Sequence, residues 1–168
     1  MPLVSVSPAS PFIDRRQSRR ALTIRTGVER HFGALGWATL PEVTLACGRR
    51  ADLMALSPKG EVAIVEIKSS LADLRADTKW PDYRAHCDAL TFATLADVPR
   101  DAFPEETGLM LADGYGAETL REAPRHPLSA HRRKALHLRF ARAAAMRLQR
   151  CCDHAGVDGG RFAEAADG

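Results

Sequence analysis

The sequence predicts a mixed α/β domain in which helices pack on a sheet. Three observations predict it: apolar residues at helical spacing near the N-terminus, three strand-like apolar runs after them, and a long amphipathic segment near the C-terminus. The chain has 168 residues, of which 45% are hydrophobic and 27% are charged. That length and composition are typical of one globular domain with a sizeable core. We expect residues 1–14 to be irregular, 15–152 to form the domain and 153–168 to be a flexible tail.

The first part of the chain should contain one helix and three strands. Residues 15–35 carry apolar side chains at helical spacing, and Gly36 is a plausible stop. The first strand contains Pro41, which indicates an edge position or an irregularity. The three strands are expected at 37–47, 49–56 and 61–68.

The second part should add a helix, a strand, a hairpin and a long helix. Residues 70–86 have helical character, interrupted near Pro81, and 89–96 read as a fourth strand. Two short apolar runs on either side of "GYG" predict a hairpin. A long helix is expected from about 129 to 150. The core order is therefore helix, three strands, helix, strand, followed by a C-terminal helix.

Several classes of protein are disfavoured by the sequence. No apolar run approaches the ~20 residues of a membrane span. The N-terminus lacks the basic and apolar regions of a signal peptide, so we expect a cytoplasmic protein. The 4 cysteines show no C-x-x-C spacing, so neither a zinc site nor a disulfide framework is predicted.

Charge is unevenly distributed along the chain. The net charge is only +3. Residues 15–25 contain 5 arginines and no acid, and residues 123–152 contain 8 Lys or Arg and no acid. Between them, residues 61–122 contain 13 acids and 6 Lys or Arg, a net of −7. Such segregation is typical of a nucleic-acid-binding surface, although solvated helix faces would give the same pattern.

The third strand ends in two charged residues. "EVAIVEIKSS" is the most apolar strand of the chain, yet it carries Glu66 and Lys68. Residues two apart in a strand share a face, so these two side chains should point the same way. A carboxylate and an ammonium at the end of a buried strand indicate either a functional site or a structural ion pair.

The turn before this strand sets its register. In "SPKG", a proline suits the first central position of a type I turn, and Gly60 suits the left-handed position after it. The closing pair of such a loop is Ser57 and Glu61. Counting outward pairs Asp52 with Glu66, with Cβ atoms roughly 4.5–5.5 Å apart.

Two adjacent carboxylates repel each other unless a positive charge lies near them. Lys68 could supply that charge, and so could a divalent metal. Hard cations such as Mg²⁺ prefer carboxylate oxygens, keep several waters and often take only one or two carboxylates. A buried Asp–Glu–Lys network with a purely structural role fits the same residues. The triplet alone leaves these alternatives open.

The same residues carry a family resemblance. Asp52, followed after a hairpin by "VEIK", resembles the D…E-x-K signature of the PD-(D/E)XK nuclease superfamily, whose core has the same order of elements. The string "RRADLMALSPKGEVAIVEIKSSLADLRADTKWPDYRAHCDALTFAT" resembles more narrowly the MmcB-like DNA-repair protein family, and the likeness covers roughly residues 15–125. This implies a restriction-endonuclease-like core. The chain has "AD" where the superfamily name has "PD", but the missing proline removes no functional group.

The resemblance implies a role for each residue of the triplet. Asp52 and Glu66 would bind Mg²⁺ or Mn²⁺, helped by the backbone carbonyl of Ile67. Lys68 would orient the attacking water or stabilise charge on the phosphate. In some branches of the superfamily a Glu on the first helix is a third metal ligand, and Glu29 is the best candidate here.

Further residues are implicated in binding nucleic acid. In some related nucleases the helix after the E-x-K strand carries a polar residue four positions before a tyrosine, and Lys79 and Tyr83 have that spacing. On the C-terminal helix, arginines including Arg139 and Arg142 fall on one side of the helical wheel and apolar residues including Leu138 on the other. We expect the apolar side to pack on the domain. The exposed arginines would then hold phosphates or simply keep the protein soluble.

The sequence thus favours a metal-dependent nuclease-like protein that hydrolyses phosphodiester bonds in DNA, in a repair role. One alternative is a catalytically silent nuclease fold that binds DNA or a protein partner. Another is a metabolic α/β enzyme with a chance E-x-K triplet, against which the absence of a Gly-rich phosphate loop counts.

Overall fold

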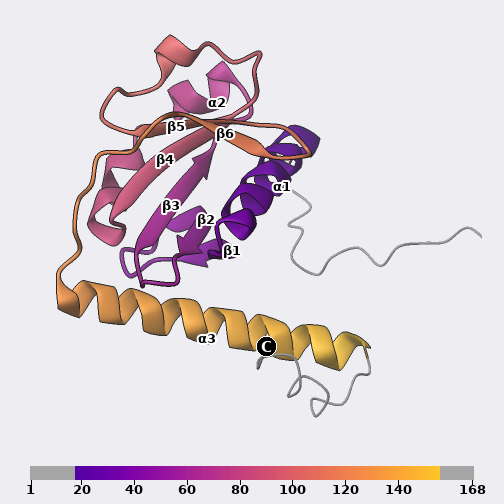
Figure 1. The fold of residues 1–168 in the computed structure, drawn as a ribbon, viewed down its shortest axis with the longest axis vertical. Helices are drawn as coiled ribbons and strands as arrows, with labels where there is room; N and C mark the ends of the chain where they lie inside the picture. The colour runs from indigo at the N-terminus through magenta and orange to yellow at the C-terminus, as the bar shows by residue number, and fades with distance from the viewer. Residues whose placement is uncertain (1–17, 156–168) are drawn as a thin grey trace, which may run out of the picture.

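The computed structural model describes residues 18–155, which form a six-stranded mixed sheet flanked by helices (Figure 1). The strand order follows the chain, from β1 to β6. β1, β2 and β3 are antiparallel, β4 and β5 continue in parallel from β3, and β6 returns antiparallel to β5. The strands are β1 Ala38–Thr44, β2 Arg50–Leu56, β3 Val62–Ile67, β4 Ala89–Thr94, β5 Gly108–Ala112 and β6 Ala117–Arg121.

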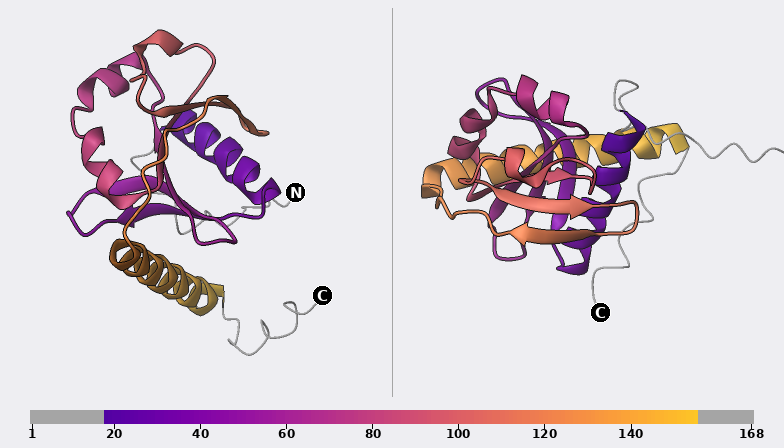
Figure 2. Two further views of the ribbon diagram at one scale, coloured as in Figure 1. Left: turned by 60° about the vertical axis from the view of Figure 1, so that its left-hand side comes forward. Right: turned by 90° about the horizontal axis from the view of Figure 1, so that it is seen from above.

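Helices lie on both faces of this sheet (Figure 2). α1 covers one face, and α2 with the 3-10 helix η1 lies on the other. α3 runs beside β1 and the β2–β3 hairpin (Figures 1 and 2). Among residues 18–155, no helix is both long enough and apolar enough to cross a membrane. The helices are α1 Arg19–Ala34, α2 Leu71–Ala76, η1 Trp80–His86, η2 Arg100–Ala102 and α3 Ala130–Ala155.

The mixed α/β architecture with a C-terminal helix is confirmed, including the hairpin around "GYG". α1 begins later than the predicted residue 15, because the Ser18 hydroxyl caps it by accepting the Ala21 N–H at 3.1 Å. It ends where expected, with Gly36 at φ +72°. The expectation for residues 1–14 lies outside the described residues.

The predicted helix over 70–86 is two separate pieces. α2 ends at Ala76 and η1 starts only at Trp80, so the break precedes the expected one at Pro81. The cause is Asp77, which adopts an extended conformation. Its carboxylate accepts the Lys79 N–H at 2.9 Å, a local bond that competes with helix continuation.

α3 differs from the prediction in length and in the face it buries. It continues to Ala155, so residues 153–155, which were expected to belong to the tail, are helical. The rest of the expected tail lies outside the described residues. The apolar side does not pack as a whole: Leu138 is 60% exposed, whereas Leu136 and Phe140 are buried.

Arginines, and not only leucines, attach α3 to the sheet. Arg139 donates to the Thr44 carbonyl at 2.9 Å, and Arg147 donates to the carbonyls of Pro41 and Glu42. These carbonyls belong to β1, an edge strand whose polar groups need partners outside the sheet. The helical wheel missed this because it assumes that only apolar side chains face the domain.

Candidate active site

The β2–β3 hairpin has the predicted register. Leu53 pairs with Val65 and Leu56 with Val62, as the turn residues require. The Ser57 N–H donates to the Glu61 carbonyl at 3.0 Å, and Gly60 takes φ +84°. The prediction that Asp52 lies opposite Glu66 is therefore confirmed.

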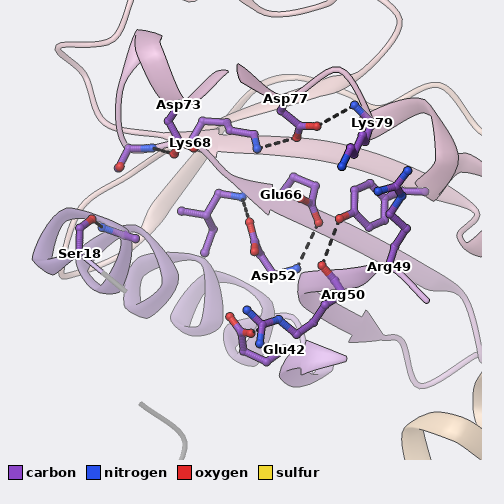
Figure 3. Close-up of a pocket in the computed structure, with 14 residues that line it drawn as sticks. Ser18, Glu42, Arg49, Arg50, Asp52, Glu66, Lys68, Asp73, Asp77 and Lys79 are labelled. Atoms are coloured by element: carbon purple, nitrogen blue, oxygen red, sulfur yellow. Dashed lines mark hydrogen bonds and ion pairs between the residues drawn. The ribbon is translucent and has the colours of Figure 1, made fainter. Parts of the chain in front are cut away.

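At the end of the hairpin, hydrogen bonds to the two carboxylates take the place of the backbone–backbone hydrogen bonds between β2 and β3. Beyond the Leu53–Val65 pair, the Asp52 N–H donates to Glu66 Oε1 at 3.1 Å. In return, the Ile67 N–H donates to Asp52 Oδ2 at 2.9 Å (Figure 3). Each carboxylate thus accepts a backbone N–H of the neighbouring strand, and these two hydrogen bonds hold the carboxylates side by side.

Both carboxyl groups are held in a setting that disfavours their charge. Glu66 is only 3% exposed. Burial, and then the neighbouring Asp52, raise the pKa of Glu66. Burial also raises the pKa of Asp52, although the Ile67 N–H and Lys68 oppose it. Both carboxyl groups therefore favour the protonated form more than exposed carboxyl groups do.

Lys68 does not fully offset the repulsion between the two carboxylates, because its closest partner is another acid. Its Nζ lies 2.6 Å from Asp77 Oδ2, and both side chains are largely buried. Burial would lower the pKa of Lys68, but the Asp77 carboxylate, with smaller contributions from Glu66 and Asp52, raises it above its ordinary value. Asp77 was missed by sequence reasoning, although it opens the block "DTKWPDY".

The triplet lines a cavity of about 530 Å³ (Figure 3). Asp52, Glu66 and Lys68 converge there, as predicted from the register. Lys79 and Tyr83 line the same cavity despite the broken helix. Lys79 is exposed, whereas Tyr83 is 7% exposed.

Tyr83 serves the architecture of the cavity. Its hydroxyl donates to the Arg50 carbonyl at 3.1 Å, which ties η1 to the start of β2. Trp80, the other aromatic residue of this block, packs against Phe92 with ring centroids 5.9 Å apart. Both aromatic residues therefore pack within the domain.

Glu29 and the α3 arginines lie elsewhere. Glu29 Oε1 is 3.7 Å from Arg25 Nε on α1, and Glu29 does not line this cavity. Arg139 and Arg142 line a separate groove between α3 and β1. The structure therefore does not bring these three predicted residues to the carboxylate pair.

A different glutamate does reach the cavity. Glu42 lies between the pairs Pro41–Leu53 and Val43–Ala51, and therefore opposite Asp52. It takes φ +54°, the left-handed region that is costly for a residue with a side chain. Its Oε2 lies 2.5 Å from Arg50 Nε, so its charge is paired. Pro41 was the only sequence signal of this irregularity.

The donor set suits a hard divalent cation with few protein ligands. Asp52 and Glu66 offer adjacent carboxylates, and Ile67, whose backbone carbonyl the family resemblance implies as a further ligand, also lines the cavity. In residues 18–155 no group of three or more His, Cys, Asp or Glu is arranged to hold a metal ion. Two carboxylates are compatible with Mg²⁺, which keeps several waters. A cation there would also relieve the repulsion within the buried pair.

Fold and cavity together define a mixed α/β protein with a buried carboxylate pair and a lysine at the ends of two sheet strands. The chain belongs to the MmcB-like family: the model described as "DNA repair protein MmcB-like" matches residues 8–155. Among solved structures it is similar to the SPO1766 protein of unknown function from Silicibacter pomeroyi. The two share 40% identity with a TM-score of 0.79, over 86% of this chain and 99% of that chain. A comparison with curated proteins gave no match.

Family membership confirms the resemblance to the MmcB-like family that was drawn from the sequence. It connects the chain with DNA repair through the description of its family. The solved relative carries no assigned function, so the chemistry of this site must be argued from its own residues.

Proposed function

We propose that this protein is a metal-dependent nuclease that hydrolyses phosphodiester bonds in DNA. The single observation that carries the proposal is the convergence of Asp52, Glu66 and Lys68 in one cavity, with the carboxylates side by side. The order α1, three antiparallel strands, α2 and a parallel strand supports a restriction-endonuclease-like core. The family's connection with DNA repair supports DNA as the substrate.

Asp52 and Glu66 would hold Mg²⁺ or Mn²⁺, with the Ile67 carbonyl as a further oxygen. Their mutual hydrogen bonds to backbone N–H groups fix both carboxylates before any cation arrives, so little ordering is needed on binding. When bound, the metal polarises a phosphoryl oxygen and lowers the pKa of a bound water.

Lys68 would stabilise the negative charge that develops on the phosphate. The Asp77 carboxylate at 2.6 Å favours the ammonium form, so Lys68 is a poor proton acceptor and a good electrostatic stabiliser. Asp77 is then a positioning residue, because it acts on the substrate only through Lys68.

A cleavage assay on labelled duplex, flap and single-stranded DNA, each with Mg²⁺ or Mn²⁺, tests this proposal. We expect metal-dependent hydrolysis that Glu66→Ala abolishes and Glu105→Ala retains, since Glu105 is an exposed residue outside the cavity. Cleavage that persists in Glu66→Ala would contradict the assignment of the site. Binding of DNA without cleavage of any substrate would favour the alternative of a catalytically silent nuclease fold.

A further inference from the structure

Three cations form one wall of the carboxylate cavity. Arg49 directly precedes β2, Arg50 begins it, and Lys79 is the residue before η1. All three line the same cavity as Asp52 and Glu66. Figure 3 shows Arg49 and Lys79 on one side of Glu66, the Arg50 side chain extending past Asp52 to Glu42, and Lys68 on another side next to Asp77. The cavity therefore combines the acidic pair with three basic residues, and we call Arg49, Arg50 and Lys79 the basic wall.

The two arginines are held in place by acids yet stay open to solvent. Arg49 donates through Nε and Nη2 to Asp82 Oδ2 at 3.0 and 2.8 Å, and its side chain is 32% exposed. Arg50 pairs with Glu42, and its side chain is 56% exposed. Such pairs fix the direction of a guanidinium without burying it, which suits recognition of a phosphate.

Lys79 is linked to the catalytic lysine through one acid. Its backbone N–H donates to Asp77 Oδ1, and Lys68 binds Asp77 Oδ2. Asp77 thus sets the relative positions of the cation proposed for the reacting phosphate and of one cation of the basic wall.

Two arginines of α3 are engaged by the sheet and not by the carboxylate cavity. Arg139 and Arg147 donate to carbonyls of β1, and neither lines the carboxylate cavity. Phosphate contacts close to the carboxylates must therefore come from residues other than these two.

We propose that Arg49, Arg50 and Lys79 bind backbone phosphates of DNA next to the phosphodiester that lies at Asp52 and Glu66. This inference rests on the proposed function, because the carboxylate pair defines where the reacting phosphate lies. The contacts are to phosphate and not to bases, so they position the strand without reading its sequence.

DNA binding measured separately from cleavage tests this wall. Fluorescence polarisation of a labelled duplex oligonucleotide, in EDTA and in Ca²⁺, gives Kd between about 50 and 200 mM salt. Lys79→Gln and Arg49→Gln should each weaken binding and make the log–log salt slope shallower by about 0.9, the value for one lost phosphate contact on duplex DNA. Circular dichroism confirms that each variant folds.

Lys59→Gln is the matched control. It removes the same charge from an exposed lysine at the β2–β3 turn, the opposite end of the hairpin from Glu66. Both wall variants behaving like Lys59→Gln would overturn the proposal, as would the absence of measurable DNA binding by the parent in both conditions. If the parent cuts no DNA but the wall variants bind it more weakly than the parent does, the wall is supported and only the nuclease function is contradicted.

Discussion

Asp52 and Glu66 illustrate how an unfavourable pair is kept in a folded protein. Each accepts a backbone N–H, which stabilises its charged form, but burial acts in the opposite direction on both. Lys68, one of the two sources of positive charge that the sequence suggested, lies 2.6 Å from Asp77. At the residue scale, either a proton or an added cation would relieve the repulsion within this pair.

Replacing Glu66 by glutamine separates a metal site from a structural network. The Gln amide oxygen can still accept the Asp52 N–H, while the negative charge is lost. Without metal, Glu66→Gln should be as stable as the parent or more stable. At 100-fold excess over Kd, Mn²⁺ should raise the parent Tm by about 5–10 °C and leave that of the variant nearly unchanged.

Thermal melts with and without Mn²⁺ measure this, with Glu105→Gln as the control that should respond like the parent. A parent that ignores metal, together with a destabilised Glu66→Gln, would identify the triplet as architecture. In that case the loss of an acid would leave the buried Lys68 short of charge compensation.

Asp88 joins three elements at the other end of the sheet. It lies between η1 and β4, and its carboxylate accepts the Val62 N–H at 2.8 Å and the Leu128 N–H at 2.9 Å. Arg133 of α3 donates to both of its oxygens at 2.7 Å. At the element scale, Asp88 therefore fixes the start of α3 against β3, while Arg139 fixes a later turn.

Neutralising this carboxylate should be costly. Asp88 is 4% exposed but the Arg133 side chain is 29% exposed, so weakening this partly buried, charge-assisted hydrogen bonding costs about 1.5–3 kcal/mol. We expect Asp88→Asn to lower the free energy of unfolding by about that amount in urea titrations at neutral pH. Asp101→Asn, which changes an exposed aspartate of η2, should differ little from the parent. Equal stability of the two variants would remove Asp88 from the docking of α3.

The same pair predicts a pH dependence. Burial would raise the pKa of Asp88, but the Arg133 guanidinium and the N–H groups of Val62 and Leu128 lower it below its ordinary value. A lowered folded-state pKa gives stability that is present above the unfolded pKa of about 3.9 and is lost as the pH falls through the folded value. The difference in stability between the parent and Asp88→Asn should therefore shrink below about pH 4. A constant difference down to pH 2 would contradict this linkage.

Across the whole molecule, the conformational preferences of turn residues predicted the β2–β3 hairpin and the pairing of Asp52 with Glu66. In "SPKG", proline restricts φ to the value that the turn needs and Gly60 can adopt the left-handed conformation after it, so these residues fixed the register that places Asp52 beside Glu66. Asp77 and Glu42 could not be found this way. Asp77 reaches Lys68 only because the chain leaves α2, and Glu42 reaches the cavity through a left-handed conformation that no local pattern encodes.

A variant of Arg142 distinguishes the two roles suggested for the exposed side of α3, which are DNA binding and solubility. Unlike Arg139, which donates to Thr44, it is an exposed residue of the groove between α3 and β1. If α3 extends the DNA-binding surface, Arg142→Gln should make the log–log salt slope of DNA binding shallower by about 0.9 at unchanged Tm. Arg139→Gln should instead lower Tm by removing a hydrogen bond from a charged donor, worth about 1.5–3 kcal/mol, with a smaller change in slope. An Arg142→Gln slope equal to that of the parent would return this helix face to a role in solubility, and would confine phosphate binding to the wall of Arg49, Arg50 and Lys79.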